Sequence, residues 1–163
     1  MRTPAGIVQF RIGEAAGRAG VTTRTLRYYQ ELGLLQPSGA TPGGNRLYSS
    51  ADVERLRRIL ELRDVMGFDL ERIRLFLRSE DRLAELRAEA RRGPSAERRA
   101  EMVAEAFELN RRMQAEVAEK QGVLEGVLAE LRANAVRYRE IADEIGLDLD
   151  DPPNESRGDA RVL

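Results

Sequence analysis

The sequence predicts a mainly α-helical protein in which a winged helix-turn-helix head precedes one long helix. Three observations lead to this fold class. Two short helical stretches meet at Gly20-Val21, a segment rich in proline and glycine follows over 37–48, and apolar residues recur with a seven-residue period over 103–145. The predicted divisions are the head over 8–79, a connecting helix and break over 80–94, the long helix over 95–145, and a disordered tail over 146–163.

The second helix of the head is the most informative part of the chain. It begins in the segment Thr-Thr-Arg-Thr-Leu-Arg-Tyr-Tyr, residues 22–29. The helical period turns Leu26 inward and Arg24, Arg27 and Tyr28 outward. An arginine fork grips a phosphate or the acceptor edge of guanine, and threonine and tyrosine hydroxyls suit phosphate oxygens. We therefore expect this helix to enter a DNA groove, the alternative being an ordinary amphipathic helix with solvated arginines.

The segment over 37–48 predicts a small hairpin wing beside that helix. It holds two prolines and three glycines in twelve residues, a composition that favours tight turns over a helix. Its last four residues alternate as a strand does. Arg46 and Tyr48 would then share one face of the strand, so we expect both to meet the DNA backbone.

Capping residues mark the helices that follow the wing. Ser49 or Ser50 is expected to begin a third helix that turns at Gly67, and Asp69 or Ser79 can begin the helical segments beyond it.

The long helix is bounded by Gly93-Pro94 and Ser95 at its start and by Gly146 at its end. Ten of the thirteen a and d positions of its heptads are apolar. The a positions are Val103, Asn110, Val117, Leu124, Leu131, Tyr138 and Ile145, and the d positions are Ala106, Met113, Lys120, Val127, Asn134 and Ile141.

A single helix of about fifty residues, about 75 Å long, cannot bury this stripe by itself. A short helix over 80–92 folding back is one partner, but we favour a helix from a second chain. Asn110, Lys120 and Asn134 either lie at the edge of the seam or fix its register.

Composition separates a basic front from an acidic back. Residues 1–79 hold 13 arginines and 8 acids, a net charge of +5, whereas residues 80–163 hold 14 basic and 20 acidic residues, a net charge of −6. The front is therefore the nucleic-acid candidate. No apolar run reaches the length of about 18 residues that a membrane span needs, and no secretory signal is expected.

The chain contains neither cysteine nor histidine. We therefore expect no metal site, no cofactor, no disulfide and a reducing, cytoplasmic location. The sole lysine, Lys120, lies inside the predicted long helix, and no glycine-rich phosphate loop occurs, so the sequence predicts that the protein is not an enzyme.

Residues 10–78 resemble the DNA-binding domain of MerR-type transcription regulators in the order and spacing of their motifs. The matching residues are Ile12-Gly13-Glu14, Gly20-Val21, Thr25-Leu26-Arg27-Tyr28-Tyr29, Gly33-Leu34-Leu35, Pro37, Gly44-x-Arg46-x-Tyr48, Asp52 and Gly67-Phe68-x-Leu70-x-x-Ile73. Two features depart from the family pattern. Asn45 stands where tyrosine is frequent, and the stretch over 63–67 is one residue longer than usual.

The resemblance implies a homodimer, held by an antiparallel coiled coil, that binds double-stranded promoter DNA and acts on RNA polymerase by distorting the promoter spacer. It also implies that Arg63 contacts DNA from a second wing. The expected DNA contacts are Thr22, Thr23, Arg24, Arg27, Tyr28, Tyr29, Arg46, Tyr48 and Arg63. The expected dimer contacts are Val103, Asn110, Met113, Val117, Leu124, Val127, Leu131, Tyr138 and Ile141.

Sensors of this family that detect metals or oxidants use cysteines near the end of the long helix, which this chain lacks. We therefore expect either a small organic effector or none. Phe107 and Tyr138 are candidates to line such a pocket, although aromatics at helical spacing are more often core residues. The alternative functions are an architectural or recombination accessory protein that bends DNA, and a scaffold whose coiled coil recruits a protein.

Overall fold

The computed structural model describes residues 8–150, so most of the tail predicted over 146–163 lies outside the described residues. The chain forms two compact units, the first up to Glu116 and the second from Val117. The elements in chain order are β1 (Gln9–Arg11), α1 (Ile12–Arg18), α2 (Thr23–Glu31), β2 (Gly39–Ala40), β3 (Arg46–Ser49), α3 (Ser50–Asp64), α4 (Leu70–Ala90) and α5 (Ala96–Ile145). The mainly helical fold with a winged helix-turn-helix head and a long last helix is confirmed.

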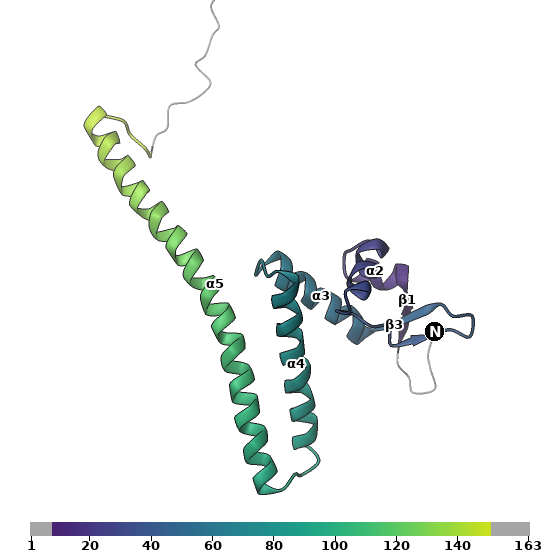
Figure 1. Ribbon diagram of the computed structural model, residues 1–163. Helices are drawn as coiled ribbons and strands as arrows, with labels where there is room; N and C mark the ends of the chain where they lie inside the picture. The colour runs from purple at the N-terminus through teal and green to yellow at the C-terminus, as the bar shows by residue number, and fades with distance from the viewer. Residues whose placement is uncertain (1–7, 151–163) are drawn as a thin grey trace, which may run out of the picture. The chain divides into compact units, whose positions relative to one another are not determined.

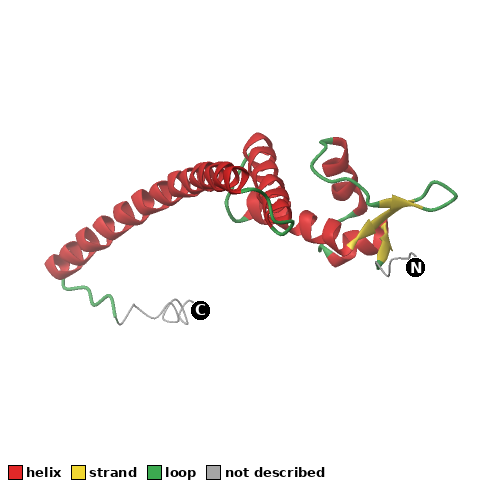
Figure 2. Ribbon diagram, turned by 90° about the horizontal axis from the view of Figure 1, so that it is seen from below, coloured by secondary structure: helices red, strands yellow, loops and turns green. Residues whose placement is uncertain are grey.

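The head is built from a small antiparallel sheet and three helices (Figure 1). The strand order is β1-β3-β2, so β3 lies in the centre, and Phe10 of β1 pairs with Tyr48 of β3. Figure 2 shows the loop that joins β2 to β3 extending from the sheet as the wing. Sequence reasoning predicted the β3 strand but not β1, which completes the sheet.

A single apolar core holds the helices of the head together. Leu26 of α2 and Ile59 of α3 are completely buried, and so is Ile73 of α4. Burial of large aliphatic side chains is the main favourable contribution to folding, at about 1.5–3 kcal/mol for each side chain. The core therefore fixes how α2 is presented on the surface.

Local capping explains where the helices of the head begin. The Thr22 hydroxyl accepts from the backbone N–H of Thr25 at 3.1 Å and caps α2. Ser49 and Asp52 form a reciprocal capping box at the start of α3. Gly20 has a φ of 73°, the left-handed conformation that glycine adopts easily in the turn between α1 and α2.

Helix α4 is continuous through the division predicted between 79 and 80. Its N-cap is Asp69, whose carboxylate accepts from the backbone N–H of Arg72 at 2.8 Å. Ser79 does not begin a new helix, because its hydroxyl donates back to the carbonyl of Leu75 at 3.1 Å within α4. Of the two candidate starts, Asp69 or Ser79, the structure uses Asp69.

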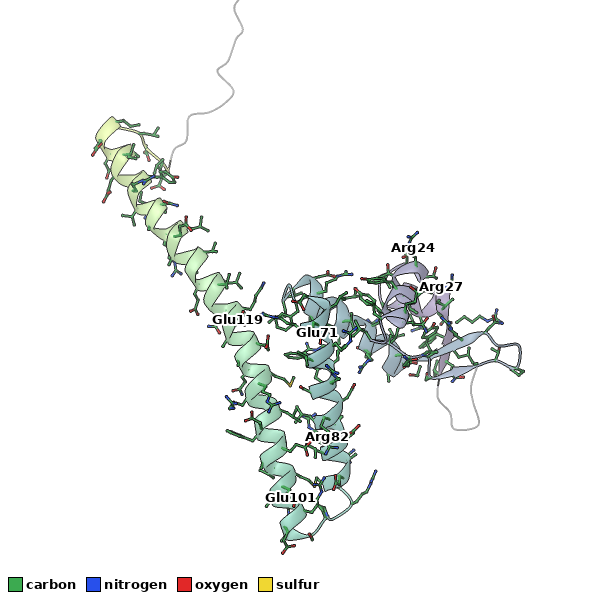
Figure 3. The ribbon with its side chains drawn as sticks, viewed as in Figure 1. Arg24, Arg27, Glu71, Arg82, Glu101 and Glu119 are labelled. Atoms are coloured by element: carbon green, nitrogen blue, oxygen red, sulfur yellow. The ribbon has the colours of Figure 1, made fainter. Side chains whose placement is uncertain are left out.

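The turn after α4 reverses the chain, and the first part of α5 lies beside α4 (Figure 1). Ser95 accepts from the backbone N–H of Arg98 at 3.2 Å, as expected for the cap of the long helix. Arg82 of α4, labelled in Figure 3, pairs with Glu105 of α5 at 2.5 Å. Arg98 pairs with Glu89 at 2.7 Å. These ion pairs connect α4 to the start of α5 within the first unit.

The second unit contains the remainder of α5, from Val117 to Ile145. Helix α5 ends at the predicted residue, and Gly146 follows it with a φ of 67°. Across the described part of the chain, no helix is both long and apolar enough to span a membrane.

Candidate nucleic-acid interface

The outer face of α2 is polar and open to solvent. Thr23, Arg24 and Arg27 are exposed, and Tyr28 is about half exposed at 47%. Figure 3 labels Arg24 and Arg27 on this helix. Together with Glu31, these four side chains line a shallow hollow of 500 Å³. The structure thus presents the outward-facing set that the helical period predicted.

A second hollow, of 740 Å³, lies between α2 and the wing. Its charged lining residues are three arginines, Arg11 from β1, Arg27 from α2 and Arg46 from β3, and one acid, Glu31, so its net charge is positive. Arg46 Nη1 donates to Oε1 of Gln30 at 3.0 Å, so the wing is connected to α2 by a side-chain hydrogen bond. A groove with three guanidinium groups attracts polyanions, and its open shape suits a nucleic-acid backbone.

Tyr48 does not lie on the surface beside Arg46, where the sequence placed it. Its side chain is completely buried, and its hydroxyl is buried with no hydrogen-bond partner. Burial raises the pKa of Tyr48, and the positive charge of Arg46 opposes that rise. The reason for the burial is that Tyr48 belongs to the apolar core of the head, where it is clustered with buried residues such as Leu26 and Ile59. Arg46 and Tyr48 therefore do not form one exposed face in this structure.

Tyr29 is also a core residue, with only 1% of its side chain exposed. Its hydroxyl accepts from Nη1 of Arg63 at 2.5 Å. Burial raises the pKa of Tyr29, and the guanidinium of Arg63 lowers it in part. The buried Tyr29 thus contacts Arg63 in the last turn of α3, while Tyr28 lies on the surface.

Arg63 lies beside α2 despite the additional residue in the segment that follows it. It lines a third hollow, of 560 Å³, together with Tyr28 and Tyr29 and the start of α4. Its guanidinium binds the carboxylate of Asp64 through Nε at 2.5 Å and Nη2 at 2.8 Å. These hydrogen bonds lower the pKa of Asp64 and raise that of Arg63.

Gln30 and Arg11 line the groove between α2 and the wing but were not among the DNA contacts predicted from the sequence. Gln30 is three positions after Arg27, so the helical period places it next to that residue, and this signal was present in the sequence. Arg11 becomes visible only once β1 is known to pair with β3, because that pairing brings the residue to the edge of the groove.

The seam residues predicted on α5 are mostly exposed in the single chain. Val103, Asn110, Val117, Leu124, Val127, Leu131, Tyr138 and Ile141 are all exposed. Met113 is different, because it packs against the core of its own head within the first unit. Met113 is thus partly buried inside its own chain, and the helix that folds back beside the first part of α5 is α4, which is longer than the helix over 80–92 that the fold-back alternative considered.

Among residues 8–150, no three metal-ligating side chains lie together. Phe107, a candidate to line an effector pocket, is 70% exposed, and Tyr138 is 57% exposed. The described residues therefore give neither aromatic an enclosed pocket within one chain.

The model of the MerR HTH family regulatory proteins matches residues 10–80. The transcriptional activator TipA of Streptomyces coelicolor is 44% identical over 85 residues, which are 52% of this chain and 32% of that protein. The transcriptional regulator YfmP of Bacillus subtilis is 39% identical over 73 residues, which are 45% of this chain and 52% of that protein. This chain therefore spans less than two thirds of either relative.

A similar fold is found in the crystal structure of HiNmlR, a MerR family regulator lacking the sensor domain, bound to promoter DNA. It is 24% identical, has a TM-score of 0.50, and the match covers 86% of this chain and 92% of that one. The matched relatives are transcription regulators, which agrees with the prediction that this chain is not an enzyme.

Proposed function

We propose that this chain, whose residues 10–80 match the model of the MerR HTH family regulatory proteins, is a promoter-binding transcription regulator that acts as a homodimer. The observation that carries the proposal is the continuity of two basic surfaces on this domain. The exposed face of α2 and the groove beside the wing share two residues, Arg27 and Glu31, so the two surfaces are continuous.

Helix α2 is the proposed recognition helix. Its exposed arginines suit base edges and phosphates in a major groove, and Arg11 and Arg46 suit the backbone beside it. Thr22, Thr23, Tyr28 and Arg63 are proposed phosphate contacts around this centre. Tyr29 and Tyr48 support the surface from the core, because their side chains are almost completely buried.

The exposed stripe on α5 supports the proposed homodimer. Leu124 is 62% exposed and Leu131 is 59% exposed, and large apolar side chains repeated along one helix face are normally covered by a partner helix. A second copy in antiparallel orientation would bring two heads to one duplex. Two-fold protein symmetry then requires a two-fold DNA site.

The proposed mode of action is distortion of the promoter spacer. Contacts from both heads offset a deformation cost on the order of 1–6 kcal/mol for a site of this size. Bending and untwisting would bring the two polymerase-contact elements onto one face of the duplex, so RNA polymerase is affected through the DNA. Because the sequence holds no cysteine, the proposed effector is a small organic molecule, or the protein acts without one. A regulator of this kind acts where the promoter is, in the cytoplasm of a bacterial cell.

The test is to map the site that the purified protein binds and to measure DNA bending there. We expect a pseudo-palindrome inside an unusually long promoter spacer, and bent DNA in the complex. Shortening that spacer to the ordinary length should give high transcription without the protein. Straight DNA in an ordinary spacer would favour steric repression, and a site at a recombination end would favour the accessory role.

A further inference from the structure

Arg63 uses all three of its side-chain nitrogens inside its own chain. Nε and Nη2 donate to the two carboxylate oxygens of Asp64 at 2.5 and 2.8 Å. Nη1 donates to the hydroxyl of Tyr29 at 2.5 Å. The Arg63 side chain is nevertheless 43% exposed, and that of Asp64 is 55% exposed. An exposed guanidinium beside the recognition helix is therefore already occupied by an anion.

The negative charge of Asp64 does not stabilise α3, the helix to which this residue belongs. Asp64 is the last residue of α3, where the helix dipole disfavours a negative charge. Consecutive residues of a helix also do not normally face each other, yet Arg63 and Asp64 pair in the last turn of α3. The contact that Asp64 does make is the two-point contact with Arg63.

Tyr29 fixes where this pair lies. The guanidinium carbon of Arg63 is 5.9 Å from the centre of the buried Tyr29 ring, and Arg63 shares a hollow with the exposed Tyr28. Tyr28 and Tyr29 belong to α2, so Arg63 is held at the edge of the proposed DNA surface. Asp64 places a carboxylate at that same edge.

We propose that Asp64 is an internal substitute for a DNA phosphate. A carboxylate and a phosphate accept the same paired hydrogen bonds from the edge of an arginine, so the two compete for Nε and Nη2 of Arg63. Double-stranded DNA must displace Asp64 before the Nε–Nη2 edge of Arg63 engages a phosphate. Arg63 then adds to the affinity only when the other DNA contacts place a phosphate next to it. The affinity for random DNA is therefore lower than it would be without Asp64. This inference rests on the proposed function, because it concerns regulation of the same surface.

The test measures binding of the full-length chain to a random-sequence duplex at several salt concentrations. Asp64→Asn should bind about two- to fivefold tighter, the range expected when an exposed ion pair is released. Its salt dependence should become steeper by about one in log–log slope, because one more phosphate is engaged. Arg63→Ala should change random-DNA binding less than about twofold, and the Arg63→Ala, Asp64→Asn double variant should return to the wild-type affinity.

Glu108→Gln is the matched control. Glu108 lies on α5 and pairs with Arg111 and Arg112, so its substitution removes one negative charge away from the proposed surface. It should bind as the wild type does, and all variants should keep the wild-type circular dichroism and melting temperature.

Three results would overturn the inference while leaving the proposed function intact: wild-type affinity for Asp64→Asn, weaker binding by Asp64→Asn, or a double variant that stays as tight as Asp64→Asn. Failure of the wild type to bind any duplex would instead overturn the proposed function, and this inference with it.

Discussion

Large apolar side chains are buried in the head and exposed along the second part of α5. In the head, Leu26 and Ile59 are completely buried by neighbours from the same chain. Along the second unit, Leu124 and Leu131 are 62% and 59% exposed. The head therefore has a complete apolar core within one chain. The apolar stripe of the second unit is not covered by its own chain.

The largest effect is expected from placing charges on the seam. Leu124→Asp with Leu131→Asp should convert the dimer to monomers and abolish specific DNA binding, because charges buried without partners cost several kcal/mol. Light scattering coupled to gel filtration measures the mass. Ala129→Asp with Ala133→Asp adds the same charge to the same helix away from the a and d positions, and should leave the dimer intact. Equal behaviour of the two pairs would contradict the seam.

Substitution inside the head should lower stability instead of changing assembly. Ile59→Ala removes a completely buried side chain from the core and should lower the free energy of unfolding by about 2–5 kcal/mol. Val136→Ala, at an exposed position of α5, should change it by less than about 0.5 kcal/mol. Denaturant unfolding of both variants measures the difference, and similar losses would contradict the contrast between the regions.

Arg27 should be the most important side chain for recognition. Arg27→Ala should weaken binding to the target site by about 1–3 kcal/mol, the range for a two-point contact with a base. Arg78→Ala, an equal change of charge on the exposed part of α4, serves as its control and should have little effect. Fluorescence anisotropy with target and random duplexes measures both, and equal losses for the two variants would exclude α2 as the recognition helix.

Arg46 should contribute less to DNA affinity than Arg27, and its contribution should be similar for all sequences. Arg46→Ala should lower affinity by similar factors for target and random duplexes, because an interaction with phosphate carries no sequence information. The log–log slope of affinity against salt should become shallower by about 0.9, because the variant neutralises one phosphate fewer. A weakening confined to the target sequence would indicate that Arg46 reads bases.

Periodic patterns and caps made much of the head predictable from the sequence. The capping box at Ser49 and Asp52, the turn at Gly20 and the end of α5 before Gly146 follow from local chemistry, and all are present. Local chemistry was not sufficient for Tyr48, because its burial depends on the helices that form the core of the head with it.

The remaining differences also come from tertiary contacts. The heptad pattern assigned Met113 to the seam, but the reversal at Gly93 brings the first part of α5 beside α4, and Met113 then packs on the head. The hydrogen bond from Arg63 to Tyr29 joins residues 34 positions apart, so no local pattern could reveal it.

The most direct test of the central claim is the mass of the wild-type protein on its mapped DNA site, measured by sedimentation equilibrium. We expect two copies of the 18.3 kDa chain on one duplex, and a dimer of the free protein at micromolar concentration. A monomeric free protein that binds its site as a single copy would contradict the proposed homodimer.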